Sequence, residues 1–171
     1  EIAQQIQGKK IAERKFPFLL KEGIIFAPHL NLEQSSSEST GNYKNAMLSG
    51  ESFIDLTSGF GIDSYFISKN FKDITLVERN SDLLEIVQHN WGILNREATF
   101  HNMELESFLE HNSKRYDVVF LDPARRDAQK NKVFLLEDLS PNILAIQDDL
   151  LNLGRKVVIK LSPLIDISYL L

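Results

Sequence analysis

The chain has 171 residues, 43% of them hydrophobic, and a net charge of −5 at pH 7. This length fits one domain with a substantial core, and the acidic balance excludes a strong overall attraction to nucleic acid. The absence of cysteine excludes disulfides and thiolate chemistry and favours a reducing, cytoplasmic setting, and no apolar run is long enough to span a membrane. Because the chain begins at Glu1 and ends within an apolar run, we expect it to be part of a longer protein.

Residues 1–48 predict an N-terminal helical extension. Apolar and basic residues alternate over residues 1–22, which indicates a helix that ends before Pro17. The basic face of this helix is either an ordinary solvated surface or a contact for nucleic acid. Residues 24–28 then indicate an extended connection that includes Pro28.

A serine-rich stretch at residues 33–44 has two interpretations: a low-complexity linker or the start of a helix. We favour a helix, because Ser36 or Ser37 can cap it and Glu38 suits its first turn. Tyr43 and Met47 would then face inward.

From residue 49 onward the pattern is regular and predicts one core, residues 49–171. Short apolar runs of the kind that is buried on both faces of a sheet predict five strands. These strands are Phe53–Leu56, Ile74–Val77, Ala98–His101, Val118–Leu121 and Val157–Leu161. Helical stretches lie between them, and this alternation is typical of an α/β, Rossmann-like, doubly wound and mainly parallel sheet.

Three of the intervening helices have recognisable boundaries or faces. One follows the first strand, and a second is capped by Ser81. A third has Ser140 as its cap and Pro141 at its first position, and it ends before Gly154. The residues expected to face the core are Ile62, Tyr65, Phe66, Leu84, Val87, Trp91, Leu94, Ile143, Ile146 and Leu150.

Ligands of open α/β sheets bind beyond the carboxyl ends of the strands, so the residues that follow each strand are the candidate site. Asp55 and Thr57 end the first strand and precede a tight turn made by Gly59 and Gly61. Such a turn lets the backbone approach a nucleotide-like ligand closely. Asp55 can attract a cationic amino group.

The next two strand ends supply Glu78 and Arg79, and then Met103 and Glu104. Glu78 lies 17 residues past Gly61, where a carboxylate can accept hydrogen bonds from both hydroxyls of a ribose. Met103 and Glu104 can contact the face and the edge of an adenine, with core packing as the alternative for Met103. Helix capping is the structural alternative for any one acid, but strand-end acids gathered beside a glycine turn favour a binding site.

The turn distinguishes between nucleotide-like ligands. A nicotinamide site requires Gly-x-Gly-x-x-Gly directly after the strand, whereas here residues 55–58 intervene and Ser64 stands at the third glycine position. A P-loop is excluded because no Lys-Ser or Lys-Thr follows the turn. A ribose diol, an adenine and a cationic amino-acid tail together match S-adenosylmethionine, and no metal site is predicted.

Residues 53–61, Phe-Ile-Asp-Leu-Thr-Ser-Gly-Phe-Gly, resemble the first motif of class I S-adenosylmethionine-dependent methyltransferases, with Thr57 where a first glycine is usual. Glu78 resembles the ribose-binding acid of that family, and residues 101–104 resemble its adenine-side segment. Residues 122–125, Asp-Pro-Ala-Arg, resemble the (Asp/Asn)-Pro-Pro-(Tyr/Phe) motif of amine methylases but depart from it at two positions. They also resemble the Asp-Pro-Pro-Arg of uridine-C5 methylases, which need a cysteine that this chain lacks.

A closer resemblance covers nearly the whole chain. Residues 33–40, 43–44, 122–127 and 159–167 are similar to a group of bacterial methyltransferases that carry a THUMP-like domain after the catalytic domain. Because THUMP domains bind RNA, the resemblance implies an RNA substrate that is bound through a domain outside this chain. The fold normally adds an antiparallel strand pair after its fifth strand, and only ten residues follow Leu161. We therefore expect a truncated, open sheet of about five or six strands, whose apolar edge favours self-association.

The resemblance also implies catalytic roles for Asp122, Pro123 and Arg125. Asp122, which is also a candidate cofactor residue, would accept a hydrogen bond from the methyl acceptor, and the backbone carbonyl of Pro123 would accept another. Arg125, with Arg126, would grip a phosphate or a base. A surface ion pair with an acid such as Asp127 is the alternative for the two arginines.

Two other functions fit the same motifs. A non-catalytic module would bind the cofactor or RNA without turnover. An oxidoreductase would use a nicotinamide cofactor on a similar sheet. Comparing the affinities for S-adenosylhomocysteine and NAD separates the oxidoreductase from the methyltransferase.

Overall fold

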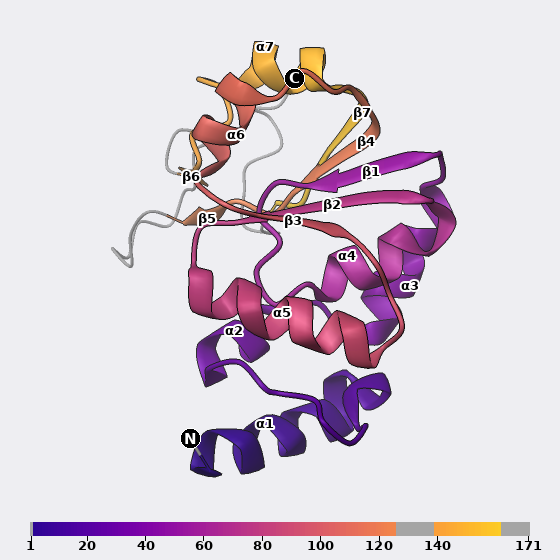
Figure 1. Ribbon diagram of the computed structural model, residues 1–171, viewed down its shortest axis with the longest axis vertical. Helices are drawn as coiled ribbons and strands as arrows, with labels where there is room; N and C mark the ends of the chain where they lie inside the picture. The colour runs from indigo at the N-terminus through magenta and orange to yellow at the C-terminus, as the bar shows by residue number, and fades with distance from the viewer. Residues whose placement is uncertain (1, 126–138, 162–171) are drawn as a thin grey trace.

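The computed structural model describes residues 2–125 and 139–161. Within these residues the centre of the molecule is a five-stranded sheet in the order β3-β2-β1-β4-β7, and every pairing in it is parallel. The strands are β1 (Ser52–Asp55), β2 (Asp73–Glu78), β3 (Thr99–Asn102), β4 (Tyr116–Leu121) and β7 (Gly154–Ile159). The predicted Rossmann-like α/β fold is confirmed, and β7 lies at one edge of this sheet (Figure 1).

Helices cover both faces of the sheet, as Figure 1 shows. One face carries α3 (Glu38–Met47), α4 (Ile62–Ile67) and α5 (Ser81–Ile93). The other carries α6 (Leu105–His111) and α7 (Gln147–Leu153). Neighbouring residues of a strand enter different layers: Phe53 packs in the first core cluster and Ile54 in the second. The central strands β1 and β4 are mostly apolar because both of their faces are buried, whereas β3 at the sheet edge has no fully buried residue.

The N-terminal extension adds α1 (Ile2–Lys15), a short 3₁₀ turn (Pro17–Leu19) and α2 (His29–Gln34) beyond the first helical layer. As predicted, the first helix ends before Pro17, and Ser37 caps α3 by accepting a hydrogen bond from the backbone N–H of Thr40. The short helix α2 was not predicted. It consists of only six residues and is too short to show a helical apolar period.

One prediction about α3 is wrong: Tyr43 and Met47 do not face inward, because they are 67% and 53% exposed. The helix packs against the core through Gly41 instead. A Cβ atom at Gly41 would lie 2.5 Å from the Phe66 ring, so the absence of a side chain lets α3 approach α4 closely. The inner face of α3 is therefore built from a small residue that an apolar pattern does not reveal.

The predicted inner faces of α5 and α7 are buried, but both helix starts differ from the prediction. Asn80, not Ser81, caps α5 by accepting a hydrogen bond from the backbone of Leu83. The helix α7 begins at Gln147, well after Ser140. Ser140 instead belongs to β6 (Leu139–Ser140), which pairs with β5 (Ala124–Arg125) in an antiparallel ladder. This pairing holds the backbone extended and delays the helix.

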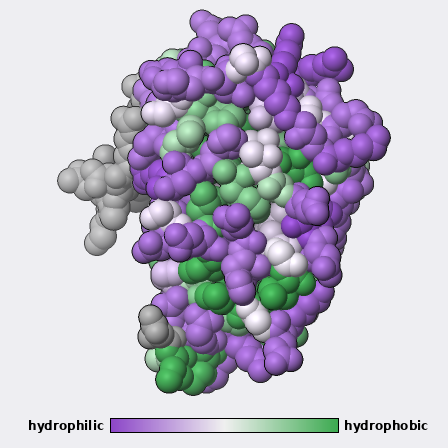
Figure 2. All heavy atoms as spheres, viewed as in Figure 1, coloured by the Kyte–Doolittle hydropathy of each residue, from purple (hydrophilic) through white to green (hydrophobic). Residues whose placement is uncertain are grey.

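The face shown in Figure 2 is mostly polar, with apolar patches in its middle and toward the end that carries α1. Ile2 and Ile6 of α1 are 79% and 55% exposed. In the part of the chain that the structure describes, no helix has both the length and the apolar character needed to cross a membrane.

Candidate functional site

A cleft opens at the carboxyl ends of β1, β2 and β4, where ligands of this architecture bind. It consists of two adjoining cavities of about 140 and 340 Å³. The larger one falls within the roughly 300–1,000 Å³ that is usual for small-molecule sites. Both are lined by Thr57, Gly59 and Asp122 from the sheet side and by Asn31 and Gln34 from α2. The extension therefore supplies one wall of the cleft.

The two glycines of the turn have different tasks. Both have a positive φ, 52° at Gly59 and 74° at Gly61, which favours glycine at each position. A Cβ atom at Gly61 would lie 2.9 Å from Val87 Cγ1 and 3.2 Å from Trp91 Nε1, so Gly61 allows α4 to pack against α5. A Cβ atom at Gly59 would meet nothing closer than 3.9 Å, and Gly59 borders both cavities. Gly59 is the position where a ligand can touch the backbone.

Asp55 stabilises the turn by accepting hydrogen bonds from the residues that flank it. It is 1% exposed, and its carboxylate accepts hydrogen bonds from the Thr57 backbone N–H, at 3.0 Å, and from the Ser64 hydroxyl. Burial raises the pKa of Asp55 to about 7, against the lowering effect of these two hydrogen bonds. Asp55 borders the smaller cavity, although both of its oxygens bond within the turn.

Glu78 faces the turn from the end of β2. One of its carboxylate oxygens accepts a hydrogen bond from the Gly59 N–H at 3.0 Å, and the other accepts one from the Asn80 N–H at 2.9 Å. A carboxylate has about four acceptor positions, so two stay available to a ligand. The strand-end acid predicted from sequence spacing therefore lies against the glycine turn.

The predicted adenine-side residues line the larger cavity together with Glu78. Arg79 and Glu104 form an exposed ion pair with a nitrogen–oxygen distance of 3.8 Å. Met103 packs on the second core cluster and also borders this cavity, and its contact with an adenine stays a prediction. Asn102 joins the two strand ends by donating its side-chain amide to the carbonyls of Glu78 and Arg79.

Asp122 lies where the two cavities meet, and its backbone N–H donates to the Thr57 hydroxyl at 2.7 Å. Thr57 therefore ties the first strand end to the fourth. Burial raises the pKa of Asp122, and a hydrogen bond from Lys160 opposes that shift. Pro123 is buried beside Asp122, and Arg125 lies in β5. Arg126 and Asp127 fall outside the described residues.

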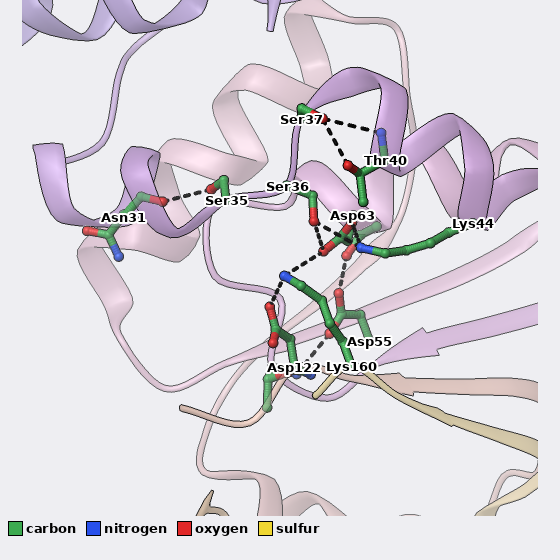
Figure 3. Close-up of polar contacts among 12 residues, drawn as sticks. Asn31, Ser35, Ser36, Ser37, Thr40, Lys44, Asp55, Asp63, Asp122 and Lys160 are labelled. Atoms are coloured by element: carbon green, nitrogen blue, oxygen red, sulfur yellow. Dashed lines mark hydrogen bonds and ion pairs between the residues drawn. The ribbon is translucent and has the colours of Figure 1, made fainter. Parts of the chain in front are cut away.

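Sequence reasoning missed a group of charged residues next to Asp122, which Figure 3 shows. Asp63 of α4 binds Lys44 of α3 and lies 3.3 Å from the ammonium of Lys160. Lys160 follows β7 and also binds Asp122. Ser36 donates to Asp63 and accepts from Lys44, both at 2.9 Å. Lys44 and Lys160 stand within segments that carried the family resemblance, but no local pattern indicated that they pair.

The family model described as "Conserved hypothetical protein 95" matches residues 36–148, which include the glycine turn, Glu78, Asp122 and all strands from β1 to β4, but not the wall of the cleft that α2 supplies. The chain belongs to this family. Among curated proteins, an uncharacterised RNA methyltransferase of Mycoplasma mobile is 30% identical over 125 residues, which are 70% of this chain and 34% of that protein.

Solved structures of similar proteins have the same fold as this chain. A candidate methyltransferase of Porphyromonas gingivalis matches with a TM-score of 0.82 and 27% identity, covering 97% of this chain and 42% of that one. A Streptococcus mutans candidate methyltransferase, crystallised with S-adenosylhomocysteine, shares the fold with a TM-score of 0.50 and 17% identity over 71% of this chain and 69% of that one. The fold is thus that of class I methyltransferases, and the chain spans less than half the length of the Mycoplasma and Porphyromonas relatives.

Proposed function

We propose that the chain is the S-adenosylmethionine-binding core of a methyltransferase that acts on RNA. The observation that carries this proposal is the Glu78 carboxylate, which lies against the Gly59 backbone at the border of the larger cavity. Its two remaining acceptor positions match the two hydroxyls of a ribose. Arg79, Met103 and Glu104 continue the same wall, where an adenine would contact them.

The smaller cavity suits the amino-acid tail of the cofactor. It is lined by Asp55, Ser58 and Gly59 on one side and by Asn31 and Gln34 of α2 on the other. The buried hydroxyl of Ser58 has no hydrogen-bond partner among the described residues. A buried polar group without a partner calls for a ligand or water, and a charged amino-acid tail fits that need.

S-adenosylmethionine supplies an electrophilic methyl group on a sulfonium. When the acceptor atom of the substrate takes that methyl group, S-adenosylhomocysteine would leave with the electron pair of the carbon–sulfur bond, and the proton of the acceptor would pass to solvent. Asp122 accepts a hydrogen bond from that acceptor, and the Pro123 carbonyl provides a second contact. Arg125 binds a phosphate or a base of the substrate. Alignment of the reacting groups alone contributes roughly 7–11 kcal/mol to such steps.

Two observations favour RNA as the substrate. The Mycoplasma mobile relative is described as an RNA methyltransferase. The sequence also resembles methyltransferases with a THUMP-like domain, which would bind RNA outside the residues of this chain. In this proposal residues 49–171 form the catalytic core, residues 1–48 form an extension that closes the cleft, and the sheet edge at β7 is a place for self-association.

A pair of titrations tests the cofactor, and one assay tests the reaction. By calorimetry we expect S-adenosylhomocysteine to bind the chain and NAD to give no heat of binding. Methyl incorporation is then measured with the full-length protein and bulk RNA from cells that lack it. Binding of NAD alone would favour the oxidoreductase. Binding of S-adenosylhomocysteine without methyl transfer would favour a non-catalytic binding module.

A further inference from the structure

Four side chains of alternating charge run from the N-terminal extension to the acceptor acid (Figure 3). Lys44 binds Asp63, Asp63 binds Lys160, and Lys160 binds Asp122. They come from α3, from α4, and from the residues that follow β7 and β4. Each acid touches at least one ammonium group, and Lys160 is shared between the two acids.

These four charged side chains are partly or largely buried, so the contacts between them affect the stability of the fold. The exposed fractions of the side chains are 13% for Lys44, 11% for Asp63, 27% for Lys160 and 38% for Asp122. Removal of one partner from a buried ion pair leaves an uncompensated charge in a site that water reaches poorly. Asp122 is more exposed than Asp63, so loss of Lys160 would leave Asp122 without this partner at the border of the cleft and would deprive the more deeply buried Asp63 of its second cation.

We propose that Lys160 is a positioning residue that keeps Asp122 ionised and aimed into the cleft for the methyl acceptor. This inference rests on the proposed function, in which Asp122 accepts a hydrogen bond from the acceptor atom. An ionised carboxylate only accepts hydrogen bonds, whereas a protonated one presents a donor in their place. The second acid, Asp63, competes with Asp122 for the same ammonium group.

The neighbouring charges act on Asp122 in opposite directions. Burial raises the pKa of Asp122, the contact with Lys160 lowers it, Asp63 raises it and Lys44 lowers it. Asp55, buried under the turn, is coupled to Asp122 by like-charge repulsion. For Lys160, burial lowers the pKa, but its contacts with Asp122 and Asp63 outweigh this effect and the pKa is raised. Lys160 is therefore the cation on which the charge state of Asp122 depends most directly.

A carboxyl titration of this chain, followed by ¹³C NMR, tests the inference without methyl transfer. We expect Lys160→Gln to move the titration midpoint of Asp122 upward. Asp63→Asn should move it downward, because the competing negative charge is removed; the asparagine oxygen then accepts only one of the two hydrogen bonds that Ser36 and Lys44 donate to separate oxygens of Asp63. Lys160→Arg should stay near the wild-type midpoint. The matched control is Lys156→Gln, an exposed lysine of β7, which should change nothing.

The longer protein supplies the second readout, methyl transfer as a function of pH. With Lys160→Gln we expect kcat to fall roughly tenfold for each pH unit below the new Asp122 midpoint and to recover above it, with cofactor affinity changed only a few-fold. If the titration midpoint of Asp122 shifts in neither Lys160→Gln nor Asp63→Asn, Lys160 has no positioning role, even if the enzyme is active. A wild-type protein that transfers no methyl group would instead overturn the proposed function.

Discussion

The two sides of the cleft are built in different ways. On the side proposed for the cofactor, the backbone N–H of Gly59 in the glycine turn donates to one strand-end acid, Glu78, and the partners come from adjacent β–α units. On the acceptor side, Asp122 depends on Lys160, 38 residues away, and Lys160 depends on Asp63, 97 residues away. The first side is a local motif, whereas the second is assembled only when the sheet is complete.

This difference separates affinity from chemistry. The turn and Glu78 offer fixed hydrogen-bonding groups that a ligand meets equally in the ground state and in the transition state, so they contribute to binding. In the proposed function the ion-paired Asp122 would interact most strongly as the acceptor atom attacks, so it would contribute to turnover. Substitutions on the two sides should therefore have different kinetic signatures.

The largest effect is expected on the acceptor side. Asp122→Asn keeps the size of the side chain but removes its charge, and we expect kcat of the longer protein to fall roughly 10²- to 10⁴-fold. The hydrogen bond from its backbone N–H to Thr57 stays in place and Lys160 keeps its contact with Asp63, so the chain should still fold. Single-turnover methyl transfer, with Asp82→Asn on the exposed face of α5 as a control, measures this effect. A loss of less than tenfold would move the catalytic role to another residue.

The next effect concerns the stability of the cofactor side. The pKa of Asp55 is about 7 in the folded chain, above its ordinary value of 3.8. Between these two pH values Asp55 is therefore protonated in the folded chain and ionised in the unfolded chain. The free energy of unfolding should therefore decrease as the pH rises through this window, by on the order of 4 kcal/mol from this group. Asp55→Asn should flatten this decrease. Urea unfolding across the window measures it, and parallel profiles for both proteins would contradict it.

The two glycines offer a finer comparison within the turn. Gly61→Ala places a methyl group against Val87 and Trp91 at a positive φ, and we expect it to lower the free energy of unfolding by about 2–4 kcal/mol. Gly59→Ala meets only the strain of the left-handed conformation, about 1 kcal/mol, but its methyl group enters the cleft. Urea unfolding should show a larger loss in the free energy of unfolding for Gly61→Ala than for Gly59→Ala. Equal losses would assign the two glycines the same role.

The contrast between the two sides also explains what the sequence could predict. Strand ends, the glycine turn and Glu78 follow from short-range patterns, and the structure brings them together. The ion pairs of Lys160 could not be predicted, because no periodicity links residues 97 positions apart. The late start of α7 has the same cause, since Ser140 pairs with Ala124 across a stretch of chain rather than with its neighbours. Arg125 was predicted from its motif alone, and its role stays a prediction.

The most direct test of the account is one calorimetric titration of S-adenosylhomocysteine into wild type, Glu78→Ala and Asp122→Ala. Charge-assisted hydrogen bonds contribute about 1.5–3 kcal/mol each, so Glu78→Ala should weaken binding by roughly 10- to 100-fold. Asp122→Ala should stay within a few-fold of wild type, and Glu85→Ala, an exposed acid of α5, should match wild type. Equal losses in Glu78→Ala and Asp122→Ala would contradict the division of the cleft into a binding side and a chemical side.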